Sequence, residues 1–130
     1  MKKKECNLII PGVITDDDIP KINHILESLE LEPKCYIFLQ PVDYIGLGLT
    51  DYLTIVKTPM DISTVKKNLK ENKYCSVQEV INDIMLIWKN CKNYNIEGSE
   101  IHDIAIYMEK QAKKIIEKYY KVKFPKQESK

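Results

Sequence analysis

Arginine is absent from the 130-residue chain, and all twenty basic side chains are lysine. The planar guanidinium of arginine is the group best suited to paired hydrogen bonds with base edges and phosphates. Its absence argues against sequence-specific recognition of nucleic acid. A formal net charge of +1 also excludes a strongly acidic or strongly basic domain. The charge is uneven, because acidic side chains gather between residues 16 and 32 and lysines dominate from residue 110 to the end.

Closely spaced cysteines are missing as well. The chain has only Cys6, Cys35, Cys75 and Cys91. No two of them are close enough to begin a zinc site or a redox motif, so we expect no metal and no cofactor. The pattern favours a reducing intracellular compartment. Long apolar runs are also absent, which argues against a membrane-spanning segment.

Four segments have apolar residues at helical spacing and predict an all-α protein with one core. Aspartate or serine begins each of the last three segments, and Glu79 is placed to form a capping box with Ser76. The four predicted helices run from Asp16 to about Leu29, from Asp61 to about Asn72, from Ser76 to about Tyr94 and from Ser99 to about Tyr119. The expected organisation is an N-terminal arm over residues 1–15, a helical domain over 16–122 and a lysine-rich tail over 123–130.

The segment "CYIFLQPVDYIGLGLTDYLTIVKTPM", from Cys35 to Met60, separates the first two helices and shows no sustained helical or strand period. Irregular connections of this length are uncommon in compact domains. This one is too rich in aromatic and aliphatic residues to be a solvated linker, so we expect it to fold back and pack. A packed loop of this kind at one end of a helical bundle predicts a cavity there.

Several consecutive stretches resemble the signatures of a bromodomain: "PVDYIGLGLTDYLTIVKTPMDISTVKKNL", "YCSVQEVINDI", "NCKNYN" and "GSEIHDIA". The resemblance runs from about Ile22 to Tyr120 and is greatest to the bromodomain and extra-terminal group. It implies a left-handed four-helix bundle whose long first loop and last interhelical loop shape a pocket for acetylated lysine. The helices expected from the apolar spacing agree with that fold.

The resemblance also implies roles for individual residues. Asn95 corresponds to the asparagine whose amide donates to the acetyl carbonyl, and Tyr52 to the tyrosine that holds the same oxygen through a bound water. The other implied pocket residues are the loop wall Val42, Leu47 and Leu49, the aromatic wall Tyr94, the gatekeeper Ile101 and the floor residue Phe38.

The shelf beside the pocket departs from the family pattern. Where the bromodomain and extra-terminal group usually has Trp-Pro-Phe, this chain has Tyr36 and Ile37 before Phe38. With Pro41, these residues are the expected shelf. The change removes an indole and a stiff proline, so we expect peptide preference to differ at the shelf while the central pocket keeps its chemistry.

Three asparagines lie in "WKNCKNYN", where an apolar helix ends. Asn90 and Tyr94 are four residues apart and share a helical face, so we expect Asn90 to bind the irregular loop and Tyr94 to line the pocket edge. Asn93 is expected to face solvent. Asn95 lies where the helix ends, so its side chain can point into the cavity.

The function implied by the resemblance is a non-catalytic reader of acetylated histone tails, of histone H3 or H4, in the nucleus. The isolated domain is expected to be monomeric. One alternative is a cysteine hydrolase using Cys91 with His102 and Asp103, although His102 is expected on the wet side of the last helix. Another is a helical protein-interaction or nucleic-acid-binding domain that uses the lysine-rich last helix.

Overall fold

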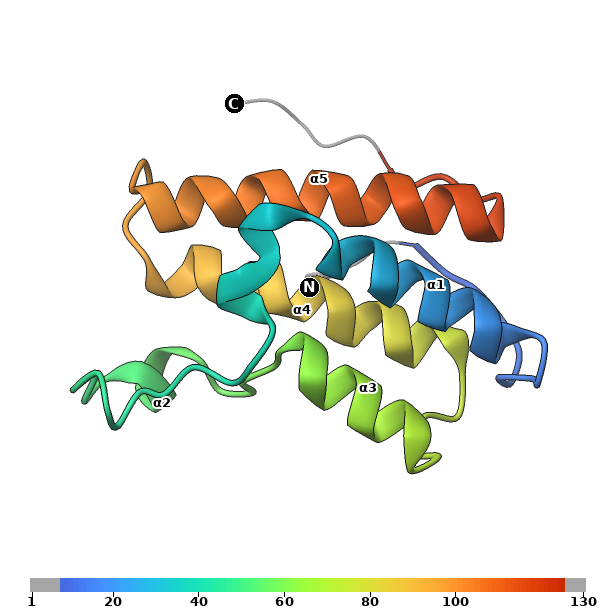
Figure 1. Ribbon diagram of the computed structural model, residues 1–130, viewed down its shortest axis with the longest axis horizontal. Coiled ribbons are helices and arrows are strands. Elements are labelled where there is room, and N and C mark those ends of the chain that lie inside the picture. The colour runs from blue at the N-terminus through green and yellow to red at the C-terminus, as the bar shows by residue number, and fades with distance from the viewer. Residues whose placement is uncertain (1–7, 126–130) are drawn as a thin grey trace, which may run out of the picture.

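The computed structural model describes residues 8–125, and within that range the protein is all-α, with no strand. Its elements in order are α1 (Asp18–Glu30), the 3-10 helix η1 (Pro33–Phe38), α2 (Tyr52–Ile55), α3 (Ile62–Lys70), α4 (Val77–Tyr94) and α5 (Glu100–Tyr120). The four longer helices α1, α3, α4 and α5 form a bundle (Figure 1). The predicted four-helix fold is therefore confirmed. None of the described helices combines the length and the apolar character needed to cross a membrane.

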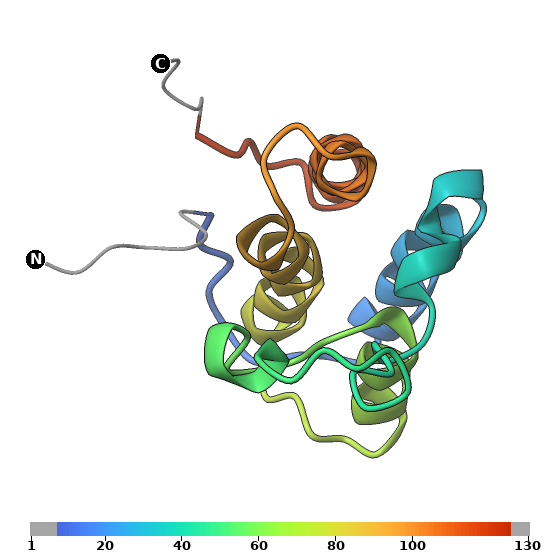
Figure 2. The ribbon, with the colours of Figure 1, turned by 90° about the vertical axis from the view of Figure 1, so that its left-hand side faces the viewer.

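The core lies between α4 and the helices around it. Figure 2 shows the four long helices around one core, with α4 beside α5 and α3 and with α1 across the core from α4. Trp88, in the second half of α4, is fully buried, and Phe38 meets its ring edge-on with centroids 5.0 Å apart. The helices bury apolar stripes at helical spacing, and each stripe faces this core. Their buried apolar members include Ile22, Ile25, Leu29, Val65, Val80, Ile84, Met108 and Ile116.

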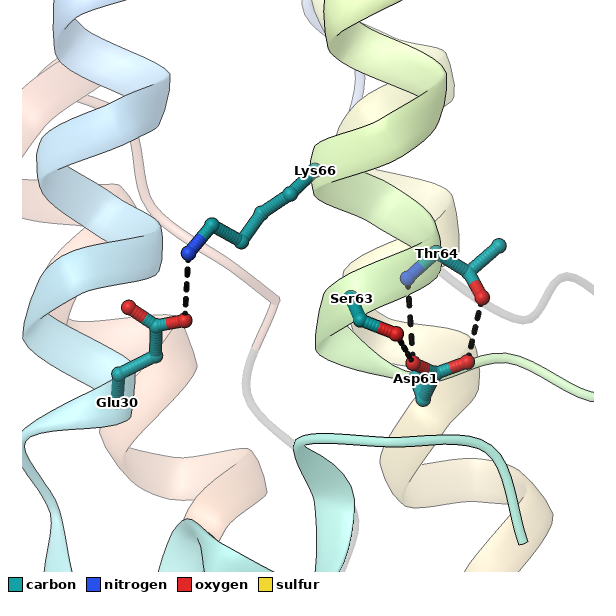
Figure 3. A network of polar contacts seen from close by, with 5 residues as sticks. All are labelled: Glu30, Asp61, Ser63, Thr64 and Lys66. Atoms are coloured by element: carbon teal, nitrogen blue, oxygen red, sulfur yellow. Dashed lines mark hydrogen bonds and ion pairs between the residues drawn. The ribbon is translucent and has the colours of Figure 1, made fainter.

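The start of α3 is held by Asp61, as its sequence predicts. The Asp61 carboxylate accepts the backbone N–H of Thr64 at 3.1 Å and the hydroxyl groups of Ser63 and Thr64 (Figure 3). One turn further along, Lys66 reaches Glu30 at the end of α1 with an N–O distance of 2.9 Å. These contacts set α3 against α1 at the point where the long loop joins the bundle.

The caps of the last two helices are confirmed with one difference. The Ser76 hydroxyl accepts the Glu79 backbone N–H at 3.2 Å, and the Ser99 hydroxyl accepts the His102 backbone N–H at 3.3 Å. The Glu79 carboxylate does not complete the predicted box with Ser76, because it accepts the backbone N–H of Cys75 at 2.6 Å. The carboxylate thereby satisfies a donor one residue before the cap.

Two parts of the chain differ from the expected elements. The segment before α3 contains η1 and α2, so it is less irregular than its sequence suggests. The first helix begins at Asp18, two residues later than expected. The reason is local: the Asp18 carboxylate accepts the backbone N–H of Thr15 at 2.8 Å and its hydroxyl at 2.9 Å, which forms a turn before the helix.

The described part of the N-terminal arm packs on the bundle. Leu8 is buried in the core, the backbone N–H of Ile10 donates to the Gln78 side chain at 2.6 Å, and that of Ile14 donates to the Cys75 carbonyl at 2.9 Å. Residues 1–7 of the arm, which include Cys6, and residues 126–130 of the tail lie outside the described residues. The boundaries at residues 15 and 122 stay predictions.

Candidate functional site

The residues expected to bind a ligand lie at one end of the bundle. Figure 1 shows α2 and its flanking loop at the same end as the connection from α4 to α5. Asn95 is the C-cap of α4, and Tyr52 begins α2. The tertiary fold thus brings together two segments that are more than forty residues apart in the sequence.

Asn95 leaves the helical conformation, with φ −97° and ψ 151°, so its side chain no longer follows the face of α4. Its Nδ2 donates to the Cys91 carbonyl oxygen at 3.0 Å and lies 3.5 Å from the Cys91 sulfur. The bond to the carbonyl orients the carboxamide, whereas sulfur is a weak acceptor. One N–H of the carboxamide is therefore held only weakly, and a ligand carbonyl would be a better acceptor for it.

Three tyrosine rings form a continuous aromatic chain beside this end of α4. Tyr52 is 6% exposed and lies between Tyr44, stacked on it at 5.5 Å between centroids, and Tyr94, which meets it edge-on at 4.9 Å. Burial and the nearby Cys91 thiol raise the pKa of the Tyr52 hydroxyl above its ordinary value. The hydroxyl is therefore protonated at neutral pH and can donate a hydrogen bond.

Tyr94 connects the end of α4 to the start of α2. Its hydroxyl donates to the Asp51 carboxylate at 2.6 Å. This bond raises the pKa of the Tyr94 hydroxyl, because the neighbouring carboxylate disfavours a phenolate. Asp51 is exposed, so the carboxylate forms part of the rim and not of the buried wall.

A tight turn shapes the loop that precedes α2. The Asp43 carboxylate accepts the backbone N–H of Gly46 at 2.9 Å, and the Tyr44 carbonyl accepts that of Leu49 at 2.8 Å. A Cβ at position 46 would lie only 2.2 Å from the Asp43 carboxylate oxygen, so only glycine fits without a shift. The turn is consequently held by its own hydrogen bonds, whereas several apolar side chains of the loop stay exposed, so the packing expected from its apolar composition is only partial.

The predicted apolar wall is only partly assembled. Leu49 is half-buried and lines an open recess of about 340 Å³ together with Tyr44, Ile45, Gly48, Thr50 and Leu53. Val42 and Leu47 are not among the residues that line this recess, and they are 38% and 66% exposed. Ile101 is 43% exposed, and its carbonyl oxygen lies 3.6 Å from the Cys91 sulfur, beside Asn95. The recess therefore lies next to the predicted pocket and shares Leu49 with it.

The family model described as Bromodomain matches residues 22–107, which is most of the chain. The chain belongs to the bromodomain family. This range begins within α1 and ends within α5, and it includes both the loop around α2 and Asn95.

Named relatives agree with that assignment. The chain is 39% identical over 85 residues to Bromodomain-containing factor 2 of Saccharomyces cerevisiae, 42% over 82 residues to Transcription factor GTE4 of Arabidopsis thaliana and 34% over 84 residues to SWR1 complex bromodomain subunit bdf1 of Schizosaccharomyces pombe. The matched segments cover 65%, 63% and 65% of this chain. They cover only 13%, 11% and 14% of those proteins, so the chain spans a small part of the relatives that it matches.

The relatives are bromodomain proteins of the bromodomain and extra-terminal type, and their names describe a bromodomain-containing factor, a transcription factor and a subunit of the SWR1 complex. Bromodomains are in general non-catalytic modules that bind acetylated lysine. The recognition of the family from its sequence signatures is therefore confirmed.

The shelf residues of this bromodomain differ in how far they are exposed. Tyr36 is 69% exposed, Pro41 is exposed and Ile37 is half-buried against the core. Phe38 is buried and packs on Trp88, so it supports the core as well as any pocket floor. The exposed phenol of Tyr36 is available to a ligand, whereas Ile37 is already partly covered.

Both helical asparagines are where the sequence predicts them. The buried Asn90 side chain donates from Nδ2 to the Thr58 carbonyl of the long loop at 2.8 Å, and Asn93 is exposed. The expectation for His102 is wrong: its ring is half-buried, and Nδ1 is a buried atom without a partner among the described residues.

The geometry does not support the cysteine-hydrolase alternative. The Cys91 thiol lies beside the Ile101 carbonyl and the Asn95 amide. Burial raises the pKa of this thiol, although the hydrogen bond from Asn95 acts against the shift. A thiol with a raised pKa is a poor nucleophile at neutral pH.

Two residues of the site were not predicted. Tyr44 stacks on Tyr52, and Asp51 accepts the Tyr94 hydroxyl. Asp51 stands beside Tyr52 in "TDY", so its position in the sequence could have indicated it. Nothing local to Tyr44 shows which ring it meets, because that contact depends on the turn at Gly46.

Proposed function

We propose that this bromodomain reads acetylated lysine on histone tails and acts as a non-catalytic targeting module of a longer nuclear protein. The observation that carries the proposal is the Asn95 carboxamide, oriented by the Cys91 carbonyl at the same end of the bundle as the buried Tyr52 ring. The relatives named as transcription factors and as a chromatin complex subunit support a nuclear role.

The chemistry of acetylation suits these groups. Acetylation converts a lysine ammonium into a neutral amide that has a methyl group, one carbonyl acceptor and one N–H donor. Asn95 donates to the carbonyl in place of its weak contact with the Cys91 sulfur. The protonated Tyr52 hydroxyl binds the same oxygen through a water, which is enthalpically close to a direct bond.

The apolar side chains complete the site around the alkyl part of the ligand. The methylene chain is expected to contact Leu49 and Ile101, and Val42 and Leu47 from the loop. All four are at least partly accessible before binding. Covering them with the ligand removes apolar surface from water and contributes about 25 cal/mol for each Å² buried.

Unmodified lysine is rejected because its ammonium would have to leave water. Moving a charged group into an apolar slot costs several kcal/mol unless a carboxylate pairs with it. The Asp51 carboxylate is exposed at the rim and already accepts the Tyr94 hydroxyl. A lysine that paired with Asp51 would stay outside the slot.

A single side chain in a shallow site buries little area, so binding is weak. We expect a binding free energy of about 5–7 kcal/mol, which is a micromolar to sub-millimolar Kd. The domain binds as a monomer, and two adjacent acetyl marks increase the affinity.

Titration calorimetry with histone H3 and H4 peptides tests the proposal. Each peptide is compared with its unmodified form and with a form in which glutamine replaces the lysine, which controls for loss of charge alone. Binding of acetylated peptides only is the expected result. Equal binding of unmodified peptides, or no binding of any acetylated peptide at millimolar concentration, would overturn the proposal.

A further inference from the structure

The charge on the exposed face of α5 changes from negative to positive along the helix. Its first turns expose Glu100 and Asp103, near Asn95, whereas its last three turns and its C-cap expose lysines. These are Lys110, Lys114, Lys118 and Lys121, here called the lysine stripe. At 100° per residue Lys110, Lys114 and Lys118 fall within about 80° of one another, so they share one face, and Lys121 follows as the left-handed C-cap.

Acidic side chains in this part of α5 are already engaged elsewhere. Glu109 pairs with Lys92 of α4 at 2.8 Å, and the Glu117 carboxylate accepts the backbone N–H of Phe124 at 2.7 Å. Residues 109–123 contain six lysines and only these two glutamates. The positive potential over the stripe is therefore only partly neutralised by the helix itself.

We propose that the lysine stripe binds the phosphate backbone of double-stranded nucleic acid without sequence preference, as a second contact separate from the Asn95 site. Lysines four residues apart rise about 6 Å along the helix, and the stripe spans about 16 Å, close to half a turn of duplex. Lysine contacts phosphates as a point charge, and the chain has no arginine to read base edges. The lysine stripe is therefore expected to bind duplexes of different sequence with the same affinity.

An anionic membrane is the less suitable partner. A helix that binds at a membrane interface inserts an apolar face into the lipid. The apolar face of α5 is already buried in the bundle through Ile104, Ala105, Met108, Ala112 and Ile116. Only the polar face is free, and a polar lysine face matches a phosphate backbone better than an acyl layer.

The position of the stripe allows both contacts at once. Asn95 precedes the first turn of α5, whereas the stripe occupies its last turns and its C-cap. The helix has 21 residues and is therefore about 31 Å long, which separates the two surfaces. A peptide held at Asn95 would not cover the stripe.

Fluorescence anisotropy with a labelled duplex of about 20 base pairs tests the proposal at several salt concentrations. The wild-type domain is expected to bind with a Kd between about 1 and 100 µM at low salt, and equally to a duplex of scrambled sequence. The logarithm of the affinity should fall with the logarithm of salt concentration with a slope between about −2 and −4.

The decisive variant is Lys110→Gln, Lys114→Gln and Lys118→Gln together. It is expected to lower duplex affinity at least tenfold and to remove most of the salt dependence, because three of the four phosphate contacts are lost. The matched control is Lys67→Gln, Lys70→Gln and Lys73→Gln, which removes the same charge from exposed positions of α3 and the turn after it. Thermal unfolding and acetylated-peptide titration of both triple variants show whether the fold and the Asn95 site are intact.

Three results would overturn the proposal: no duplex binding by the wild type at 50 mM salt, an equal loss in both triple variants, or binding to vesicles of anionic lipid without binding to duplex. Equal losses would mean that net charge alone drives association. Peptide binding is measured separately from duplex binding. A negative duplex result therefore does not affect the proposed binding of acetyl-lysine, and a negative peptide result does not affect the proposed binding of duplex by the lysine stripe.

Discussion

The buried side chain of Asn90 donates to the carbonyl oxygen of Thr58 at 2.8 Å and so ties α4 to the long loop. The two residues are 32 positions apart in the sequence. Thr58 lies between α2 and α3, so this bond helps to set where the loop leaves the bundle and returns to it. The end of the bundle that carries Asn95 depends on that placement.

Asn90→Ala is expected to lower the free energy of unfolding by about 1 kcal/mol, because the hydrogen bond from the buried Asn90 side chain to the Thr58 carbonyl is lost. Acetylated-peptide affinity should fall as well, since the loop is less well held. Urea unfolding measures the first effect and calorimetry the second. Asn93→Ala, at an exposed position of the same helix, is the control and should change neither quantity. Equal effects of the two substitutions would contradict this role for Asn90.

Asn95→Ala is expected to abolish detectable binding of acetylated peptides while the fold stays intact. The substitution removes the donor to the acetyl carbonyl and one hydrogen bond to the Cys91 carbonyl, which is worth about 1 kcal/mol of stability. Calorimetry measures binding, and thermal unfolding checks the fold. Unchanged heats of titration would refute the assigned role. Asn95→Asp provides a further comparison, because it keeps the size of the side chain and loses the donor.

Tyr52→Phe should weaken peptide binding less than Asn95→Ala, because the hydroxyl acts through a water while the ring contacts with Tyr44 and Tyr94 remain. Since burial raises the pKa of Tyr52, its hydroxyl stays protonated, and peptide affinity is expected to be constant from about pH 6 to 9. Titrations across that range measure it. A loss of affinity in the wild type below pH 9 that Tyr52→Phe removes would contradict the protonated state assigned here.

Asp18 contributes a stability that depends on pH. Burial raises the pKa of its carboxyl, but hydrogen bonds from the Thr15 backbone, the Tyr120 hydroxyl and the Thr15 hydroxyl, with the charge of Lys21, outweigh burial, so the net pKa is lowered. A lowered pKa stabilises the folded state above the unfolded pKa of about 4, and this stabilisation is lost as pH falls through the folded pKa.

Asp18→Asn should therefore reduce the free energy of unfolding at pH 7 by less than about 1 kcal/mol, since solvent screens a partly exposed group. The difference from wild type should shrink below about pH 4. Urea unfolding at pH 7 and near pH 3 measures it. Asp16→Asn, an exposed neighbour, serves as the comparison. A penalty that grows as the pH falls would show that the sign assigned to Asp18 is wrong.

Much of the helical frame could be predicted because its causes are local. A cap depends on one side chain and a backbone group three residues away, so Asp61, Ser76 and Ser99 could be assigned from their spacing. Asn90 could be assigned to the loop because a buried carboxamide on an apolar helix requires a partner. Glu79 was assigned to the wrong donor, since Cys75 and Ser76 both offer a backbone N–H within its reach.

The sequence alone determined the family and the four long helices, because periodicity, capping and motif order are properties of neighbouring residues. Only the tertiary structure decided that Tyr44, Tyr52 and Tyr94 form one aromatic chain and that Val42 and Leu47 are largely exposed. These features depend on how the loop closes through the Asp43 and Gly46 turn and the Asn90 bond to Thr58. Such contacts join residues whose separation in space cannot be read from their order in the chain.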